Sequence, residues 1–515
     1  MTLRQGLSFP RRTFLKGLAT AALVPAFSPS ILATPAKGGA LKMAIGHGSS
    51  TDTLDPATYL DYFTGTSFWG TLSNSLTEVD ANGKVAPDLA ESFETADGAK
   101  TWLFKLRKDV EFHNGKKVVP GDVVASMRHH MGEKSKSAAK SILADVIDIT
   151  PDGDVVKFTL SNGNLDFPFL VSDWHLPIMP ANSDGSADWS SGIRTGPYAL
   201  ESFEPGVRAR FKRNARYYRP TWFEEVEILS VVDPAARTNA LLAGDVDYID
   251  RCDLKTLELL QRNQAVEIDE VTGYAHYMFV MNVTQPPFDN PKVREALKYA
   301  IDRQSILDKI LLGHGTVGND NPISPSLSCA FNPVPVHSYN PQKARELLQA
   351  AGLDSLKIEL SAADAAFSGA VGAAELFKAS AEKAGIDITV VREANDAYWD
   401  NVWMKKPFVA MYWNGRATCD WMFTTAYAAD AAWNETFWKN PQFNSLLVAA
   451  RQETNPAARQ KMYDEMQQLI HDDGGAINFA FNNYVSAHSK HVSHGKLAAN
   501  WDHDGMKIAQ RWWRS

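Results

Sequence analysis

Residues 313–318 (GHGTVG) match the G-x-G-x-x-G pattern of dinucleotide-binding sites. In such sites the glycines follow a strand and open a helix, so that the backbone can approach the pyrophosphate. Here the motif follows a helical pattern at residues 305–312 and runs into Asn319, Asp320 and Pro322. We therefore expect a glycine-rich loop and not a dinucleotide site.

The histidines and acidic residues form no pattern typical of metal or catalytic chemistry. His129 and His130 are adjacent, but the 13 histidines include no H-E-x-x-H sequence and no regular metal-ligand spacing. A G-x-S-x-G nucleophile motif is also lacking. The adjacent acids at 224–225 and 472–473 point in different directions and do not converge. We predict no metal site, no cofactor and no enzymatic activity.

The three cysteines, Cys252, Cys329 and Cys419, are odd in number and widely spaced. This spacing gives no disulfide framework and contains no C-x-x-C motif. We interpret them mainly as small buried apolar side chains.

The first 36 residues have the composition of a removable export signal. A basic run at residues 11–16 (RRTFLK) precedes an apolar stretch at 17–31 and a small-residue exit near 33–36. The adjacent arginines resemble a twin-arginine (Tat) signal, and a general secretory (Sec) signal is the alternative. Pro25 and Pro29 interrupt the apolar stretch, which argues against a membrane anchor. We predict a periplasmic protein.

The composition is that of a globular, acidic protein. The chain has 515 residues, of which 22% are charged and 44% hydrophobic. Residues 1–36 carry four basic residues and no acidic residue, so removing them takes the net charge from -8 to -12. An acidic protein is a poor nucleic-acid binder. The 14 Trp and 15 Tyr could line an enclosed pocket.

Hydrophobic periodicity predicts a mixed first half and an α/β second half. In the first half we expect strands at 41–45, 102–106, 155–160, 198–203 and 208–212, and helices at 66–76 and 123–128, the latter capped by Asp122. In the second half we expect helices at 292–301, from 341 to a cap at Gly352, at 372–383 and at 457–470, with strands at 356–360, 386–391, 408–413 and 476–481. This alternation indicates an α/β lobe within a larger two-lobed protein.

Several blocks resemble the extracellular solute-binding proteins that serve peptide and nickel ABC importers, solute-binding protein family 5. They are residues 87–93 (PDLAESF), 101–115 (TWLFKLRKDVEFHNG), 121–126 (GDVVAS), 194–198 (RTGPY) and 282–297. Their order is that of the family, and the resemblance covers nearly all of the chain after the signal.

The resemblance implies a two-lobed, type II periplasmic-binding-protein fold of the α/β class. The lobes would be joined by strands that cross near 277–283 and 484–486. The implied limits are a signal at 1–36, a first lobe at 37–280 with an inserted subdomain at about 80–190, a second lobe at 281–484 and a C-terminal return at 485–515. Ligand would bind between the lobes, which would close around it.

The resemblance also implies ligand contacts. The family's dipeptide binders hold the ligand's α-amino group with an aspartate just after a Trp-containing strand, a place that residues 411–423 occupy here. Asp420 is the implied ammonium partner, through a charge-assisted hydrogen bond. Trp413 and Trp421 are implied stacking or cation–π partners, and Cys419 would line the same wall. The alternative is a loop acid beside two core tryptophans.

In one place the chain departs from the dipeptide binders. They carry an arginine for the ligand carboxylate in the loop after the second lobe's first strand, where this chain has Asp364 and no arginine. A buried carboxylate needs a cation or donors, and Arg416 could supply it from the other loop. Otherwise the ligand lacks a carboxylate there, or is longer or cationic. Asp61 and Tyr62 lie where the family often places further contacts.

Together these observations predict the periplasmic substrate-binding component of an ABC importer. Its partners would be a small ligand (a peptide, an amino-acid derivative or another amine-bearing solute), a permease and the ATPase subunits. We expect a monomer without membrane anchor, nucleic acid or cofactor. An exported cofactor-containing enzyme, or a binding protein for a sugar or a metal complex, is the alternative. A stoichiometric cofactor in the folded protein would favour the enzyme.

Overall fold

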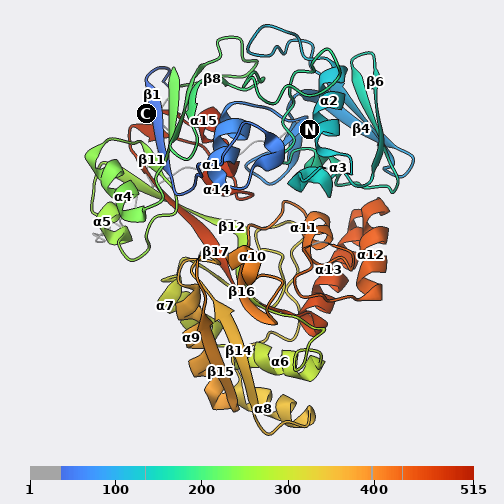
Figure 1. Cartoon of the computed structure of the whole chain (residues 1–515), viewed down its shortest axis with the longest axis vertical. Helices are drawn as coiled ribbons and strands as arrows, with labels where there is room; N and C mark the ends of the chain where they lie inside the picture. The colour runs from blue at the N-terminus through green and yellow to red at the C-terminus, as the bar shows by residue number, and fades with distance from the viewer. Residues whose placement is uncertain (1–35, 134, 396–397, 432) are drawn as a thin grey trace, which may run out of the picture. The chain divides into compact units, whose positions relative to one another are not determined.

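An 11-stranded mixed sheet runs through both lobes of the protein (Figure 1). The computed structural model describes residues 36–133, 135–395, 398–431 and 433–515. The predicted export signal lies outside the described residues, so its Tat or Sec character remains a prediction.

The order of strands in this sheet places the second lobe at one end and the first lobe at the other. In spatial order the strands are β15 (Ile386–Arg392), β14 (Leu356–Ala362), β16 (Phe408–Trp413), β12 (Val266–Met281), β17 (Ala476–Ser489), β11 (Tyr248–Ile249), β1 (Ala40–Ile45), β10 (Glu225–Ser230), β9 (Arg208–Arg213) and β8 (Tyr198–Glu204), and β13 (Gly315–Val317) also pairs with β17. The two central strands, β12 and β17, therefore belong to both lobes.

Strands β12 and β17 are the crossing segments that the resemblance implied. They pair antiparallel from Val266 opposite Ser489 to Val280 opposite Ala476. The ladder is irregular between Thr272 and His276, and again between Tyr277 and Met278. The predicted two-lobed fold with crossing strands is confirmed, while the residue limits proposed for each lobe remain a prediction.

The first lobe carries a second, antiparallel sheet. Its strands, in spatial order, are β4 (Ala90–Ala96), β5 (Thr101–Leu106), β7 (Val155–Leu160) and β6 (Val146–Asp152). Trp102, Phe104 and Leu106 are buried while the residues between them are more exposed, which is the expected alternation of a half-buried strand. Two smaller sheets pair β2 (Thr77–Val79) with β3 (Val85–Pro87), and β18 (Val492–Ser493) with β19 (Trp513–Arg514).

Many helices begin with the same local chemistry, a proline at the first position behind an Asn or Asp cap. The Asn290 side chain, just before Pro291, accepts a hydrogen bond from the Lys292 amide. The Asn340 side chain, just before Pro341, accepts one from the Lys343 amide. The helices are α1 (Tyr62–Thr64), α2 (Pro120–His130), α3 (Phe167–Leu170), α4 (Pro234–Ala243), α5 (Leu257–Gln261), α6 (Pro291–Ala300), α7 (Arg303–Ile310), α8 (Pro341–Ala350), α9 (Ala370–Ala381), α10 (Tyr398–Asn401), α11 (Cys419–Ala426), α12 (Pro441–Gln452), α13 (Pro456–Asp473), α14 (Asp502–Gly505) and α15 (Ile508–Arg511).

Three local predictions need correction. The helix expected at 66–76 is a π-helical segment, η2 (Gly65–Thr71), followed by a loop. The glycine-rich loop expected at 313–318 contains the short strand β13, because it pairs with β17. Helix α2 begins at Pro120 and not after Asp122, whose carboxylate accepts from the Val119 amide at 2.9 Å.

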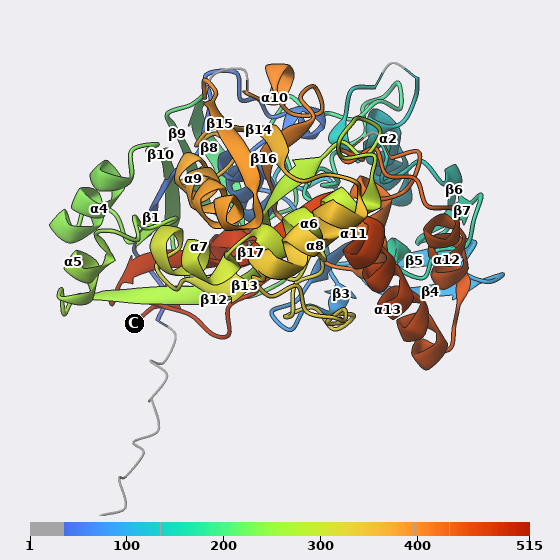
Figure 2. The same cartoon turned by 90° about the horizontal axis from the view of Figure 1, so that it is seen from below.

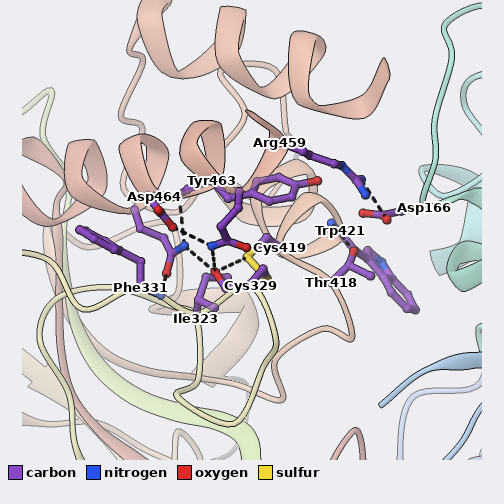
Figure 3. The surroundings of a disulfide bond; sticks show 12 residues. Asp166, Ile323, Cys329, Phe331, Thr418, Cys419, Trp421, Arg459, Tyr463 and Asp464 are labelled. Carbon is purple, nitrogen blue, oxygen red and sulfur yellow. Dashed lines mark hydrogen bonds and ion pairs between the residues drawn. A yellow bond between two sulfur atoms is a disulfide. The ribbon is translucent and has the colours of Figure 1, made fainter. Parts of the chain in front are cut away.

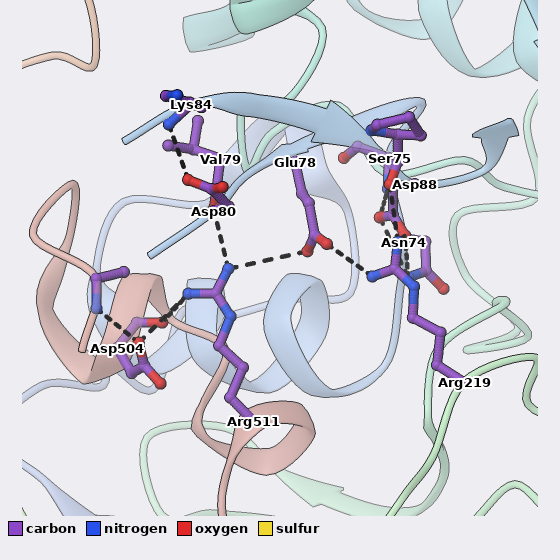
Figure 4. Close-up of polar contacts among 12 residues, drawn as sticks. Asn74, Ser75, Glu78, Val79, Asp80, Lys84, Asp88, Arg219, Asp504 and Arg511 are labelled. Atoms are coloured by element: carbon purple, nitrogen blue, oxygen red, sulfur yellow. Dashed lines mark hydrogen bonds and ion pairs between the residues drawn. The ribbon is translucent and has the colours of Figure 1, made fainter. Parts of the chain in front are cut away.

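The C-terminal segment returns to the first lobe and is held there by ionic contacts (Figure 4). Arg511 donates to the Val79 carbonyl at 2.9 Å and pairs with Asp504 at 3.3 Å. Glu78, next to Val79, pairs with Arg511 at 3.9 Å and with Arg219 at 2.7 Å. At Gly70 a Cβ atom would lie only 1.8 Å from the Met506 carbonyl oxygen, so only glycine allows this close approach.

Helices α12 and α13 of the second lobe lie at the same end of the molecule as strands β4–β7 of the first (Figure 2). Arg459 pairs with Asp166 at 2.9 Å, and Arg451 pairs with Asp145 at 3.5 Å. The Leu165 amide donates to the Arg451 carbonyl at 3.0 Å. These inter-lobe ion pairs connect the lobes at a second place besides β12 and β17. None of the helices within the described residues is long and apolar enough to span a membrane.

Candidate ligand-binding site

A cavity of about 320 Å³ lies between segments of the two lobes. Its first-lobe wall consists of His47, Tyr59, Leu60, Asp61, Tyr62, Ser141, Ile142, Asp173, Trp174, His175, Arg251, Trp501 and Met506. Its second-lobe wall consists of Trp399, Trp403, Met411, Tyr412, Trp413, Asn414, Arg416, Trp421, Thr425 and Trp433. The cavity therefore combines an aromatic lining with a small number of charged groups, as small-molecule sites do.

The second-lobe wall is a connected group of tryptophan rings. Trp399 packs edge-on against Trp403, and Trp403 edge-on against Trp433, with ring centroids 6.1 and 6.3 Å apart. The Trp433 ring lies tilted against Trp413, with centroids 5.8 Å apart. Trp413 and Trp421 are buried, whereas Trp399 and Trp433 are 37% and 39% exposed. Such exposure of large rings beside a cavity is typical of a surface that binds a partner or ligand.

A buried carboxylate, Glu435, fixes two of these rings from behind. It accepts hydrogen bonds from the indole nitrogens of Trp403 and Trp413, the latter at 2.8 Å. Burial raises the pKa of Glu435 to about 7, although both hydrogen bonds favour the charged form. Glu435 itself does not line the cavity and acts by positioning Trp403 and Trp413.

Arg416 is the cation of the second-lobe wall. Its guanidinium carbon lies 5.5 Å from the centroid of Trp413 and 5.7 Å from that of Trp421, so two electron-rich ring faces flank the charge. Its hydrogen bond within the described residues is to the Gly415 carbonyl, at 2.7 Å, and no ion pair joins it to a carboxylate among them. Burial lowers the pKa of Arg416, but an arginine stays protonated in proteins.

The turn that presents Arg416 requires a glycine. Gly415 has φ = 70°, in the left-handed region. A Cβ atom at this position would lie 2.3 Å from the Tyr274 carbonyl oxygen of β12. The turn after β16 is therefore pressed against a crossing strand, which places Arg416 at the junction of the lobes.

The first-lobe wall carries both signs of charge. Asp61 caps α1 by accepting from the Thr64 amide at 3.0 Å, and it also accepts from the Gly48 amide at 3.1 Å. Asp173 accepts from the His175 ring at 2.6 Å. Arg251 lies 5.4 Å from the Tyr62 ring centroid, with Asp502 3.8 Å from its Nε. The charges on this wall are thus already engaged within the lobe.

The structure brings together five of the eight residues suggested by the resemblance. Asp61, Tyr62, Trp413, Arg416 and Trp421 all line the cavity. These positions support their proposed role in ligand binding, which no bound ligand tests here.

The other three residues are not part of the cavity lining, and their suggested roles in ligand binding stay predictions. Asp420 is buried in α11, where its carboxylate accepts from Arg451 Nε at 2.8 Å. Its carboxylate is therefore engaged in a packed ion pair in this structure. Asp364 is exposed in the loop after β14 and is not part of the lining.

Cys419, the third, is bonded to Cys329, so the expectation of no disulfide was wrong (Figure 3). The two residues are 90 positions apart. The Cys329 carbonyl also accepts from Gln467 Nε2 at 2.9 Å and Gln460 Nε2 at 3.2 Å, both on α13. The bond ties the start of α11, the helix that carries Trp421, to this anchored loop. Cys252 is free and buried, as expected.

Sequence reasoning missed several lining residues. Trp399, Trp403 and Trp433 belong to a tryptophan-rich stretch, and that local density was the available signal. Asp173 and Arg251 had no local signal, because only the folded chain brings them beside Tyr62.

A family model described as bacterial extracellular solute-binding proteins, family 5, matches residues 84–435, more than half of the chain. The glutathione-binding protein GsiB of Escherichia coli K12 is 27% identical over 480 residues, covering 88% of this chain and 91% of that protein. GsiB of Salmonella choleraesuis is 26% identical over 487 residues, covering 90% and 93%.

Two solved structures show the same fold. The periplasmic binding protein DppA of Helicobacter pylori, in complex with the peptide STSA, has a TM-score of 0.80 at 21% identity, covering 93% of this chain and 99% of that one. The PBP AgaA of A. tumefaciens R10, in complex with agropinic acid, has a TM-score of 0.78 at 24% identity, covering 92% and 97%. The chain belongs to family 5 of the bacterial extracellular solute-binding proteins, which confirms its predicted extracytoplasmic location and its role as the substrate-binding component of an ABC importer.

Proposed function

We propose that this protein captures a small zwitterionic solute, a peptide or amino-acid derivative, between its lobes in the periplasm and delivers it to the permease. It acts as a monomer, by binding and closure without covalent chemistry, and its permease is driven by ATPase subunits. The observation that carries the proposal is Arg416, a partly buried cation on the cavity wall with no carboxylate partner among the described residues.

A carboxylate on the ligand would complete the environment of Arg416. A guanidinium presents several N–H donors in a planar fork that matches a carboxylate, and such pairs are among the stronger hydrogen bonds in proteins. Because the rings of Trp413 and Trp421 flank the guanidinium, its N–H edge is the part that would donate to a ligand carboxylate. The same rings offer faces to an apolar or planar part of the solute.

An ammonium group on the ligand would be received by the opposite wall. Asp61 and Asp173 line the cavity there. Each already accepts hydrogen bonds from its own lobe, but a carboxylate has about four acceptor positions, so capacity remains for a ligand donor. A zwitterion would thus contact both lobes at once, which favours the closed arrangement.

The size of the cavity supports a single small solute. Its volume of about 320 Å³ lies near the lower end of the range for small-molecule sites, about 300–1,000 Å³. By their name, the curated relatives bind glutathione. Glutathione carries one ammonium and two carboxylates, so it belongs to the class of ligand that we propose.

The experiment has two parts. Ligand released by denaturing the purified protein is identified by mass spectrometry, and calorimetry then compares glutathione, dipeptides and amino-acid derivatives with their carboxyl esters. We expect esterification of the group that contacts Arg416 to weaken binding at least tenfold in the wild type, and far less in Arg416→Ala. A released ligand without a carboxylate, or equal binding of acid and ester, would contradict the proposal.

We also propose that export uses the Tat pathway, from the pair Arg11–Arg12 and the residues behind it. Replacing both arginines with lysine should abolish the appearance of mature protein in the periplasm. Unchanged export of the variant, or export of the wild type in a Tat-deficient strain, would show that the Sec alternative is correct.

A further inference from the structure

A carboxylate and two imidazoles converge at the first-lobe end of the crossing strands, away from the cavity. Asp269 lies on β12 opposite Ser486 of β17, so His488, two residues further, lies on the same face of the sheet. His494 follows β18 and reaches the same point. One ligand atom from each of the three residues lies within 4.8 Å of the other two.

In their neutral forms, the two rings would each direct an Nε2 lone pair at the carboxylate. His488 Nδ1 lies 3.0 Å from the Ser489 carbonyl, and His494 Nδ1 lies 2.7 Å from the Gly495 carbonyl. A carbonyl only accepts, so both Nδ1 atoms carry the proton, and in the neutral ring Nε2 is then the acceptor. Metal-binding histidines are fixed in this way, through the ring nitrogen that does not bind the metal.

The Nε2 atom of His488 has no partner in the described part of the chain. The His488 side chain is 2% exposed, and its Nε2 makes no hydrogen bond, although Oδ2 of Asp269 is 3.4 Å away. That carboxylate oxygen is itself buried and without a hydrogen bond. Two acceptors that face each other in a buried place repel unless a cation lies between them. A proton on His494 would account for its contact with Asp269 at 3.2 Å, but it leaves His488 unexplained.

The spacing fits a small metal ion. For a tetrahedral zinc site with bonds of about 2.0–2.1 Å, neighbouring ligand atoms are about 3.3–3.4 Å apart. The distance from Asp269 Oδ1 to His494 Nε2 is 3.2 Å and that from Asp269 Oδ2 to His488 Nε2 is 3.4 Å, so each carboxylate oxygen lies at about this spacing from one imidazole nitrogen. Imidazole with carboxylate suits zinc and its neighbours and not magnesium or calcium, which prefer oxygen ligands.

A second cluster of the same residue types provides a contrast. Asp250, Asp502 and His503 also lie within 4.8 Å of one another. There, however, Arg237 lies 3.2 Å from Asp250, and Arg251 lies 3.8 Å from Asp502. These arginines already neutralise the carboxylates, whereas no lysine or arginine ion pair to Asp269 occurs among the described residues.

We propose that Asp269, His488 and His494 bind one divalent transition-metal ion, with zinc the preferred ion, and that a solvent molecule completes the coordination. The His494 side chain is 17% exposed and Asp269 11%, which gives the ion a route from solvent. The ion joins both crossing strands to the C-terminal segment, where Trp512 packs on both imidazoles with centroid distances of 5.0 and 4.5 Å. Its role is structural, because the three ligands come from separate segments that the ion would hold together.

The test uses the full mature protein, freed of any affinity tag and treated with a chelator. Calorimetry with zinc chloride should give one site per chain, with a dissociation constant below the micromolar range, and zinc should raise the unfolding temperature. His494→Ala should weaken zinc binding by at least about tenfold. His491→Ala is the matched control, since this exposed histidine lies in the same segment and outside the cluster. Magnesium should not bind.

Two results would overturn the proposal. One is the absence of stoichiometric zinc binding in the wild type, which would leave a proton as the occupant. The other is undiminished binding in both His494→Ala and His488→Ala, which would place the ion elsewhere, for example in the ligand cavity. Circular dichroism of each metal-free variant establishes that it is folded, so that lost binding reflects a lost ligand. Cobalt provides a further readout, because tetrahedral coordination gives intense visible absorption that His494→Ala should lose.

Discussion

The two walls of the cavity differ in how far their charged groups already have partners within the protein. The second-lobe wall presents packed tryptophan rings and one cation, Arg416, that lacks an acidic partner in the described residues. The first-lobe wall presents acids that already cap a helix or hold a histidine. The charge on the second-lobe wall is therefore without an opposite charge until a ligand binds, whereas the acids on the first-lobe wall already accept hydrogen bonds from their own lobe. From this contrast we expect most of the binding energy to arise on the second lobe, and the first lobe mainly to select and enclose the ligand.

The largest expected effect is that of Arg416→Ala on ligand affinity. Truncating one partner of a buried charged pair costs about 2–5 kcal/mol, or roughly 30- to several-thousand-fold in dissociation constant. Asp61→Asn on the other wall should cost less, because Asp61 is already engaged by two amides. Calorimetry with the native ligand ranks the two variants. An effect of Asp61→Asn equal to or larger than that of Arg416→Ala would reverse the comparison.

Loss of the disulfide should reduce the stability of the protein by weakening the support of the second-lobe wall. The bond closes a long loop, and removing a native disulfide of this kind costs typically about 2–4 kcal/mol in free energy of unfolding. Urea unfolding of Cys329→Ser with Cys419→Ser measures this cost. Cys252→Ser, at the free cysteine, is the control. Equal stability of the double variant and the wild type would show that the wall does not depend on this bond.

Asp420→Asn should reduce stability and spare the ligand's amine contact. The substitution leaves Arg451 without its partner at 2.8 Å, and breaking a buried pair costs about 3 kcal/mol or more. We expect lower resistance to urea, with any change in affinity the same for a ligand and its N-acetylated form. A loss of affinity confined to the ligand with a free amine would restore the role that the resemblance suggested for Asp420.

The last predicted effect is a pH dependence of stability that arises from Glu435. Its pKa in the folded protein, about 7, is raised from an ordinary value of 4.5, so the folded state holds this proton more tightly than the unfolded state. The contribution to stability is present below pH 4.5 and is lost as the pH rises through 7, by at most about 1.4 kcal/mol per pH unit. Glu435→Gln, neutral throughout, should lack this fall in urea unfolding between pH 5 and 7.5. Parallel pH profiles for variant and wild type would mean that Glu435 stays ionised.

The sequence predicted the elements whose periodicity is local. Strand β5 alternates at Trp102, Phe104 and Leu106, and α6 has a proline and an asparagine cap at its start, so both could be identified without tertiary information. The π-helical segment at Gly65–Thr71 could not, since its shape depends on the close approach of Met506. The length of β17 was also underestimated, because its second half pairs with a strand some 200 residues earlier.

The site was predictable only where its residues are neighbours in the chain. Trp413, Arg416 and Trp421 were found together because β16, a glycine turn and α11 follow one another. Within the same stretch, the sequence did not reveal that the Asp420 carboxylate pairs with Arg451. The pairing of Cys329 with Cys419 and the convergence of Asp269 with two histidines depend on contacts between distant segments.

The inter-lobe ion pairs could change the affinity for a ligand from a place outside the cavity, because they favour the closed form. Arg451 with Asp145 and Arg459 with Asp166 connect the lobes beyond the crossing strands, and Asp145 is 34% exposed. When only the closed form binds fully, the apparent dissociation constant equals the intrinsic one divided by the fraction of molecules that are closed. Salt screens exposed pairs more than buried ones, so we expect the Arg451–Asp145 pair to make the closed fraction depend on the ionic strength outside the cell membrane. Two homologues with identical cavities could thus differ in sensitivity through these four side chains alone.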